Sequence, residues 1–458
     1  MHAPWKESGK AVPQSVAWKQ QTSSRRWTLV LANSLTGNAL RRSPNGLSSG
    51  MSYAAMLPQQ TQHSRSTTGA TSNALVNTAN AGSPWITEET RIFRQMVRAF
   101  VEQDLVPHQS RWAEQGLPDA DAWTKAGRMG LLLPDVPEQY GGGGGTFAHE
   151  AVVIEELARA GVHFGVGVQS VVAHHILAYG SEAQKQRWLP RMATGELIGA
   201  IGMTEPDCGT DLQSIRTMAR KDGDQYVIDG SKTFITNGRQ ASLVCLAVRT
   251  NADTHGPKAL SLIVIETADL PGYRVGRSLD KIGRHAQDTC ELFFEGVLVP
   301  AGNLLGLGEG RGLFQLMDQL RYERLSVGLS AVASAEQAVE ITTRYVKERK
   351  LFGKPLLDLQ NTRFKLAECK TEAHIGRVFV DHCIQQFIAG QLDGVTAAMA
   401  KYWLTDAQCR IIDECVQLHG GYGYMQEYAI ARMWADSRVQ RVYAGSNETM
   451  KDVIGWSL

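Results

Sequence analysis

The chain has 458 residues, of which 43% are hydrophobic and 20% are charged, and this length allows about three domains. The composition is ordinary for a globular protein and excludes a collagen-like or wholly disordered chain, and no apolar run reaches the ~20 residues that a membrane-spanning helix needs. The net charge of +1 is unevenly distributed, because residues 1–83 carry eight Lys or Arg and one acid, which leaves 39 basic and 45 acidic residues in the remainder. This mildly acidic remainder argues against a nucleic-acid-binding surface.

The first 83 residues predict a disordered or dispensable extension. They are rich in Ser, Thr, Asn, Gln and Gly and lack a sustained hydrophobic period, so they cannot bury enough apolar surface to offset the entropy of ordering. Their Arg- and Ser-containing, nearly acid-free composition also fits an organelle transit peptide. The alternatives are a dispensable tail or an over-extended start with Met51 as an internal initiator. A tail would place the protein in a bacterial cytoplasm, and a transit peptide would place it in the mitochondrial matrix.

Residues 84–196 predict a helical domain. Thr87 is a candidate N-cap followed by two glutamates in the first turn, and apolar residues from Ile92 onward follow the 3.6-residue period. Four further helices are expected over residues 119–129, 149–160, 167–179 and 181–193. The five glycines at 141–145 lack both the strand context of a dinucleotide-binding loop and a following Lys-Ser or Lys-Thr. They therefore predict a flexible loop between helices and not a phosphate cradle.

Residues 197–310 predict a small antiparallel β domain, because the apolar period changes to two. Two turn dipeptides, Asp229-Gly230 and Asn237-Gly238, lie among β-prone residues. Strands are expected at residues 243–249, 259–266, 273–277 and 290–299. Long helical stretches return from 311 to 458, with glycine-containing breaks at 353–355, 390–394 and 420–423. Helices followed by strands and then by helices argue against a doubly wound sheet, in which the two alternate.

A carboxylate interrupts the apolar stripe of the first C-terminal helix. Four apolar residues share one face of this helix: Leu316, Leu320, Val327 and Ala331. Glu323 falls on the same face, where a carboxylate costs several kcal/mol unless it is paired or has a function. Arg321 and Arg324 are close enough in sequence to pair with it. From these residues alone, an ion pair and a catalytic role are about equally expected.

The cysteines and histidines predict no metal site. Seven cysteines are widely spread without a Cys-x-x-Cys pair, and no second histidine stands at ligand spacing from His419. The cysteine pattern also disfavours a disulfide framework and predicts a reducing compartment.

Five segments combine glycine with polar or cationic residues at turns and helix ends, where a single such segment is most often a β turn or a helix cap. In chain order they read Met-Thr-Glu-Pro-x-x-Gly-Thr-Asp (203–211), Phe-Ile-Thr-Asn-Gly (234–238), Arg-Lys-x-Phe-Gly-x-Pro-Leu (349–356), Gln-Leu-His-Gly-Gly-x-Gly-Tyr (417–424) and Tyr-x-Gly-Ser-Asn-Glu (443–448). Together, in this order, they resemble the acyl-CoA dehydrogenase family over about residues 84–458.

The resemblance implies a mainly α-helical fold with a central β domain: an N-terminal helical domain, a small antiparallel β domain and a C-terminal four-helix bundle. It also implies a homotetramer, arranged as a dimer of dimers, that binds FAD without the Rossmann glycine motif, and this chain lacks that motif. By motif matching, the residues that would line the flavin are Met203, Thr204, Gly209, Thr210, Phe234, Thr236, Ser446 and Glu448. Those that would hold the pyrophosphate and adenosine, largely of a neighbouring subunit's FAD, are Arg349, Phe352, Gln360, Gln417, Gly420 and Gly421. Those that would contact the substrate are Thr210, Arg324, Ala444 and Gly445.

The resemblance also favours catalysis over pairing for Glu323. Many family members carry the base as Glu in Tyr-Glu-Gly-Thr, where this chain has Ala444. Long-chain and isovaleryl types carry it in the middle helix within Glu-Arg-Leu, which matches residues 323–325. The implied reaction removes the α-proton of an acyl-CoA thioester with Glu323 and passes a hydride from the β-carbon to flavin N5, which leaves a trans-2-enoyl-CoA. The backbone N–H of Ala444 and a flavin ribityl hydroxyl would donate to the enolate oxygen.

The resemblance implies that the reduced flavin passes its electrons to an electron-transferring flavoprotein. An oxidase of the same fold that uses oxygen is one alternative, and a non-catalytic scaffold that binds acyl-CoA or flavin is another. The intact Glu323 and the complete motifs argue against a scaffold. The sequence leaves the length and branching of the acyl chain open.

Overall fold

The computed structural model describes residues 82–251 and 256–458. All of them belong to one compact unit, Leu75–Leu458. The extension expected at residues 1–83 lies outside the described residues except for Gly82 and Ser83. Ser83 is buried and its hydroxyl donates to Asp381 at 2.7 Å, so this residue belongs to the folded unit.

The N-terminal part is helical, as predicted. It contains α1 (Glu88–Phe100), α2 (Gln109–Gln115), α3 (Ala120–Arg128), α4 (Phe147–Ala160), α5 (Val166–Tyr179) and α6 (Glu182–Ala193). Thr87, Thr146 and Ser181 begin α1, α4 and α6 with capping boxes, in which side chains satisfy backbone N–H groups of the first turn. The predicted cap at Thr87 is therefore confirmed. The seven-residue helix α2 was not expected, because it is too short to show a hydrophobic period.

The glycine run at 141–145 is closely packed, which corrects the expectation of a flexible loop. A Cβ added to Gly142 would lie 2.2 Å from the carbonyl oxygen of Val136, so a larger residue has no room. All five backbone N–H groups donate to nearby backbone carbonyls. None is left to bind a phosphate, which agrees with the absence of a phosphate-loop motif.

The middle part is a seven-stranded sheet. Its strands are β1 (Gly199–Gly202), β2 (Met218–Asp222), β3 (Gln225–Thr236), β4 (Leu243–Arg249), β5 (Leu260–Glu266), β6 (Tyr273–Ser278) and β7 (Thr289–Pro300). They follow the order β1-β4-β2-β3-β7-β6, and β5 pairs with β4.

Two expectations for this sheet were wrong. The sheet is mixed, because β4 pairs in parallel with both β1 and β2, whereas a purely antiparallel sheet was predicted. These pairs are separated by enough chain for a crossover, and local strand patterns do not report such pairing. Asp229-Gly230 is also not a turn, since β3 runs through it with a register shift between Ile228 and Gly230. Asn237-Gly238 does follow the end of β3, with Asn237 at φ +62°.

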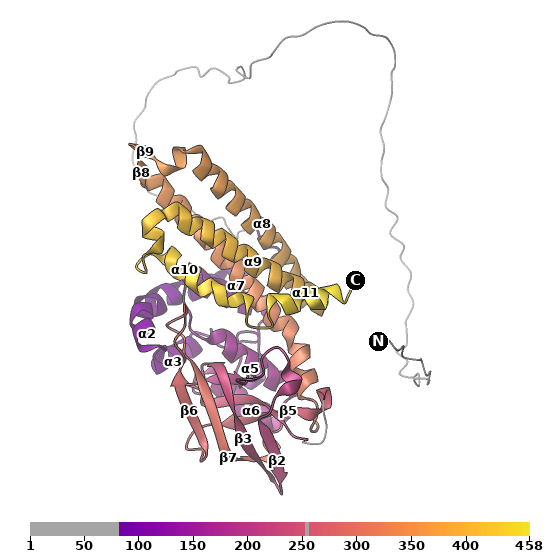
Figure 1. The fold of residues 1–458 in the computed structure, drawn as a ribbon. Coiled ribbons are helices and arrows are strands. Elements are labelled where there is room, and N and C mark those ends of the chain that lie inside the picture. The colour runs from indigo at the N-terminus through magenta and orange to yellow at the C-terminus, as the bar shows by residue number, and fades with distance from the viewer. Residues whose placement is uncertain (1–81, 252–255) are drawn as a thin grey trace, which may run out of the picture. The chain divides into compact units, whose positions relative to one another are not determined.

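The C-terminal part is a helical bundle. It contains α7 (Gly312–Glu348), α8 (Gln360–Ile388), α9 (Gly394–His419), α10 (Ala429–Ser437) and α11 (Asn447–Gly455), with a short hairpin of β8 (Lys350–Leu351) and β9 (Lys354–Pro355) between α7 and α8. Helices α7 to α10 pack together and α11 packs on α9. Helix α7 extends beyond the bundle and reaches the β domain, where it contacts β5 (Figure 1).

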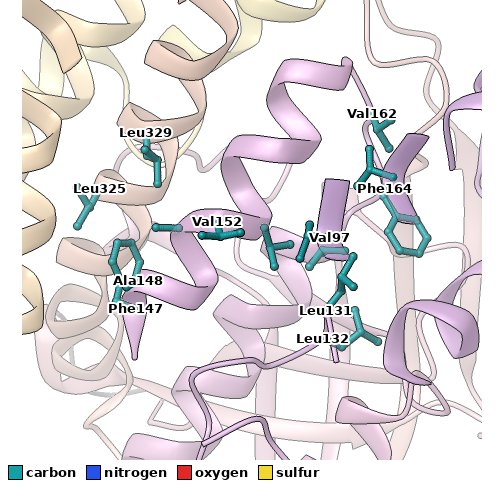
Figure 2. Close-up of a cluster of buried hydrophobic side chains, with 14 of the residues drawn as sticks. Val97, Leu131, Leu132, Phe147, Ala148, Val152, Val162, Phe164, Leu325 and Leu329 are labelled. Carbon is teal, nitrogen blue, oxygen red and sulfur yellow. The ribbon is translucent and has the colours of Figure 1, made fainter. Parts of the chain in front are cut away.

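Helix α7 joins the bundle to the N-terminal helices through an apolar core. Leu325 and Leu329 face Phe147, Ala148 and Val152 of α4 (Figure 2). These residues are almost completely buried. The segment of α7 that carries Glu323 is therefore packed between α4 of the N-terminal part and helices α8 and α9 of the bundle.

The predicted apolar stripe of α7 is only partly correct. Leu316 and Ala331 are buried, but Leu320 and Val327 are half-buried. The middle of α7 packs against α4, α8 and α9 at once. It therefore buries four consecutive residues, Tyr322 to Leu325, and not a single face.

Among the described residues, none of the helices has the length and apolar character needed to cross a bilayer.

Candidate active site

Glu323 is a buried carboxylate without a partner. Its side chain is 8% exposed, and Oε1 has no hydrogen-bond partner among the described residues. Burial raises the pKa of Glu323 to about 7, although the neighbouring charge of Arg324 opposes the rise. A carboxylate with this proton affinity is suited to act as a general base near neutral pH.

The ion-pair interpretation of Glu323 does not hold. Arg321 is half-exposed and pairs with Asp318 at 3.0 Å. Among the residues that the structure describes, Arg324 makes a long contact of 3.5 Å from Nη1 to the carbonyl oxygen of Gly394, and its buried Nε has no hydrogen-bond partner. In the described part of the chain, Glu323 has no ion pair within 4.0 Å. A buried acid and a buried N–H donor thus follow one another on α7, each without a hydrogen-bond partner among the described residues.

The loop before α11 carries the predicted substrate contacts. Ala444 and Gly445 both have left-handed backbone, at φ +53° and +83°. An alanine in this conformation costs of order 1–3 kcal/mol and persists only where its surroundings hold it. The buried ammonium of Lys401 on α9 donates to the carbonyl oxygen of Gly445 at 2.6 Å, and the guanidinium of Arg284 lies 5.4 Å from the ring of Tyr443. The loop is therefore fixed both to the bundle and to the β domain.

The two C-terminal residues expected at the flavin lie at the start of α11. The Ser446 hydroxyl caps this helix by accepting from the N–H of Thr449 at 3.2 Å. Glu448 is exposed in the first turn. No hydrogen bond or ion pair between described residues joins either of them to the β-domain residues.

A buried ion pair assembles the β-domain part of the site. Lys232 on β3 is completely buried, and its Nζ donates to Glu205 at 2.8 Å and to the carbonyl oxygen of Met203 at 3.0 Å. Although burial opposes it, the charge of Lys232 lowers the pKa of Glu205. The N–H of Thr233 also donates to the carbonyl oxygen of Thr204 at 2.9 Å. These contacts hold the Met203–Thr204 segment against the end of β3.

The same contacts bring Met203 and Thr204 beside the strand that carries Phe234 and Thr236. Met203, Thr204 and Thr236 are half-buried, whereas Gly209 and Thr210 are exposed in the turn that follows. Phe234 is 67% exposed and has φ +60°, at a register shift between Lys232 and Ile235. An exposed aromatic ring held in strained backbone forms a surface for a planar ligand.

A second group of predicted residues surrounds a cavity of about 600 Å³ at the other end of α7. Arg349, Gln417, Gly420 and Gly421 line it, and the guanidinium of Arg349 lies 5.4 Å from the ring of Tyr422. Glycines beside a cation can admit a phosphate close to the backbone.

Two further residues predicted for this group, Phe352 and Gln360, do not line the cavity. Both are exposed, and Phe352 is 94% exposed at φ +50°. His419 lines the cavity but is occupied, since its Nδ1 contacts the carbonyl oxygen of Cys415 at 2.8 Å and its ring stacks on Tyr345. These contacts agree with a structural role for His419 and not with a metal-ligand role.

Within a single chain, the Arg349 cavity lies far from Glu323. Glu323 and Arg349 are separated by most of α7, which corresponds to roughly 39 Å at 1.5 Å per residue. This distance exceeds the reach of a dinucleotide. A second copy of the chain would be needed to bring an Arg349 cavity to the Glu323 end.

Two buried lysines that hold these segments in place, Lys232 and Lys401, were not predicted as site residues from the sequence. Lys232 lies in the Phe-Ile-Thr-Asn-Gly strand, and Lys401 lies on α9 among buried apolar residues. The argument that singled out Glu323, a charge at an apolar helical position, applies equally to Lys401. As for metals, no group of three or more His, Cys, Asp or Glu within the described residues could hold an ion.

Comparison with known proteins identifies the family. Models of the acyl-CoA dehydrogenase N-terminal, middle and C-terminal domains match residues 87–196, 200–297 and 310–458. The chain belongs to the acyl-CoA dehydrogenase family.

Similar proteins cover nearly all of the described chain. The long-chain specific acyl-CoA dehydrogenase of Sus scrofa mitochondria is 44% identical over 80% of this chain and 85% of the relative. An acyl-CoA dehydrogenase structure from Geobacillus kaustophilus is 46% identical, with a TM-score of 0.80, over 82% of this chain and 99% of its own. A glutaryl-CoA dehydrogenase from Mycobacterium smegmatis in complex with FADH2 is 29% identical, with a TM-score of 0.77, over 82% and 96% of the two chains.

This acyl-CoA dehydrogenase is therefore an FAD-dependent oxidoreductase. Its described residues fit the cofactor. The exposed ring of Phe234 offers a face for the isoalloxazine, and the cavity beside Arg349 offers a cation for a pyrophosphate.

Proposed function

We propose that this acyl-CoA dehydrogenase introduces a double bond between the α- and β-carbons of an acyl-CoA thioester, with Glu323 as the general base. The observation that carries the proposal is the unpaired, buried carboxylate of Glu323 with a pKa of about 7. The α-proton of a thioester is weakly acidic, so its removal needs a base of raised proton affinity and a stabilised enolate oxygen.

The proposed donors for the enolate oxygen come from the loop before α11 and from α7. The backbone N–H of Ala444 would donate to the thioester oxygen, and the unpartnered Nε of Arg324 is a second donor near the base. Thr210 and Gly445 complete the proposed substrate contacts. FAD, when bound, supplies the acceptor for the hydride that leaves the β-carbon. The product is a trans-2-enoyl-CoA, and an electron-transferring flavoprotein would take the electrons onward.

The proposed cofactor contacts fall into the two groups described above. Met203, Thr204, Gly209, Thr210, Phe234 and Thr236 would line the flavin, together with Ser446 and Glu448. Arg349, Phe352, Gln360, Gln417, Gly420 and Gly421 would serve the FAD of a neighbouring subunit. The separation of roughly 39 Å along α7 supports this sharing, which needs at least two copies of the chain, and the homotetramer is proposed from the family resemblance. The 44% identity to a long-chain specific relative favours long acyl chains.

The test is a panel of substrates from butyryl-CoA to palmitoyl-CoA, with isovaleryl-CoA included, mixed anaerobically with the flavin-loaded protein. Loss of flavin absorbance, strongest for long chains, is expected. Reoxidation of the reduced protein by an electron-transferring flavoprotein, and not by oxygen, would separate a dehydrogenase from an oxidase. A colourless protein that takes up no FAD, or flavin that no acyl-CoA reduces, would contradict the proposal.

A further inference from the structure

Lys401 is a completely buried cation that bonds to the proposed substrate loop. Its Nζ donates to the carbonyl oxygen of Gly445 at 2.6 Å and to Oδ1 of Asn447 at 2.9 Å. Both acceptors are neutral, and among the described residues Lys401 has no carboxylate within 4.0 Å. Helix α9 thus holds the segment between Tyr443 and α11 through one side chain.

The burial of the Lys401 ammonium costs free energy of folding. Burial of an ammonium with no carboxylate in contact costs several kcal/mol, and burial lowers the pKa of Lys401 to about 8, although the charges of Asp406 and Glu448 oppose the fall. The positive charge of Arg324 lowers it further, so a second cation lies nearby. An apolar residue of the same length would avoid both penalties. It would also leave the carbonyl oxygen of Gly445 without the Lys401 donor, so the distinguishing contribution of a lysine at this position is its bond to the loop.

The loop that Lys401 holds needs an external restraint. Ala444 is left-handed, a conformation that its side chain disfavours, and Gly445 follows in the same region. Asn447 adds a second anchor, because its Nδ2 donates to the carbonyl oxygen of Tyr402 and to Asp406 at 2.9 Å. The Gly445 carbonyl lies two peptide groups after the one that carries the Ala444 N–H, so a donor on it restrains that N–H through the left-handed Ala444–Gly445 backbone between them.

We propose that Lys401 is a positioning residue that, through its bond to the Gly445 carbonyl, holds the left-handed Ala444–Gly445 loop in the conformation that presents the Ala444 N–H to the thioester oxygen. The inference rests on the proposed function, because it assigns a task to the loop only if a thioester binds there. Lys401 touches neither the substrate nor Glu323 in this account. It fixes the geometry of a donor, and its charge adds to the positive field beside Arg324.

The variant Lys401→Met removes the donor and nearly preserves the volume. With the flavin-loaded enzyme and saturating palmitoyl-CoA, we expect flavin reduction to slow by about 100-fold, as for a misplacement of about 1 Å. The dissociation constant of palmitoyl-CoA should change less than about 3-fold, because the contacts that bind the ground state and the transition state equally are retained. Lys401→Gln keeps a hydrogen-bond donor on a shorter side chain, so its rate of flavin reduction should lie between those of wild type and Lys401→Met. If Lys401→Met does not fold, Lys401→Gln is compared with wild type instead. Ile412→Val, a buried change elsewhere on α9, is the matched control and should leave the rate unchanged.

A second measurement distinguishes a positioning role of Lys401 from a role in stability alone. In a Glu323→Gln background, palmitoyl-CoA labelled with carbon-13 at the thioester carbonyl binds without turnover. Its carbonyl stretch should move to lower wavenumber on binding, and Lys401→Met should abolish most of that shift. An unchanged shift, or a wild-type rate in Lys401→Met, would overturn the inference. If no acyl-CoA reduces the flavin of the wild-type protein, the proposed function is wrong. The shift of the carbonyl stretch on binding would still test whether Lys401 positions the Ala444 N–H.

Discussion

Replacement of Glu323 by Gln should make the protein more stable at alkaline pH while it removes the base. The folded chain holds the proton of this carboxyl more tightly than the unfolded chain does, because burial raises its pKa from 4.5 to about 7. The folded state therefore binds more protons between these values, and the free energy of unfolding falls as pH rises through the window. The amide cannot ionise and avoids this loss.

The size of the effect follows from the same shift. One pKa unit corresponds to about 1.4 kcal/mol, so the full penalty above pH 7 is about 3 kcal/mol. Near pH 5 most of the penalty is absent, and the two proteins should differ by less than about 1 kcal/mol. For a chain of this length, the trend with size converts each kcal/mol into roughly 1–2 °C of Tm, which predicts a gain of about 3–6 °C at pH 8.

Thermal unfolding at pH 5 and pH 8, with equal protein concentration and excess FAD, measures this difference. Other buried groups, including Glu150 and Asp288, are present in both proteins and cancel. Glu336→Gln on the same helix is the matched control, because Glu336 pairs with Arg377 at 2.9 Å and its replacement should lower the Tm. A Glu323→Gln protein that is no more stable than wild type at pH 8 would refute the desolvation of this carboxylate.

Three further outcomes follow from the cofactor groups. Phe234→Gly relieves a left-handed backbone and removes an exposed ring, so the apoprotein should gain up to about 1 kcal/mol of stability while FAD affinity, followed by flavin fluorescence, falls. Arg349→Ala should weaken FAD retention on ultrafiltration, whereas the exposed neighbour Lys347→Ala should not; equal retention in both would contradict the cavity assignment. Lys232→Met leaves the carboxylate of Glu205 buried and unpaired, which should cost about 3 kcal/mol in urea unfolding; an unchanged midpoint would show that the pair is dispensable.

The sequence predicted the elements that depend on local pattern. Capping residues such as Thr87 and the alternating side chains of β3 and β7 are read from neighbours along the chain, and both agree with the structure, whereas β4 and β5 are buried on both faces and do not alternate. The parallel pairing of β4 was not predictable in this way, because it depends on which distant segments meet. The bulge at Asp229-Gly230 has the composition of a turn, and only the pairing with β7 shows that the strand continues.

The site residues also differ in whether they could be predicted from local sequence. Glu323 could be found because a charge at an apolar helical position is visible in one segment. The cavity beside Arg349 could not, since it joins residues about 70 positions apart, from the end of α7 to the end of α9. Whether Arg321 or Arg324 pairs with Glu323 also required coordinates, because both lie within one helical turn of it.

The rate of flavin reduction by saturating palmitoyl-CoA, measured anaerobically across pH in wild type and Glu323→Gln, tests the central claim most directly. The wild-type rate should rise as the carboxyl ionises near pH 7 and then level off. The variant should keep its FAD and bind the thioester, yet reduce flavin at least about 100-fold more slowly and without that rise. Reduction by the variant at the wild-type rate would show that another group removes the α-proton.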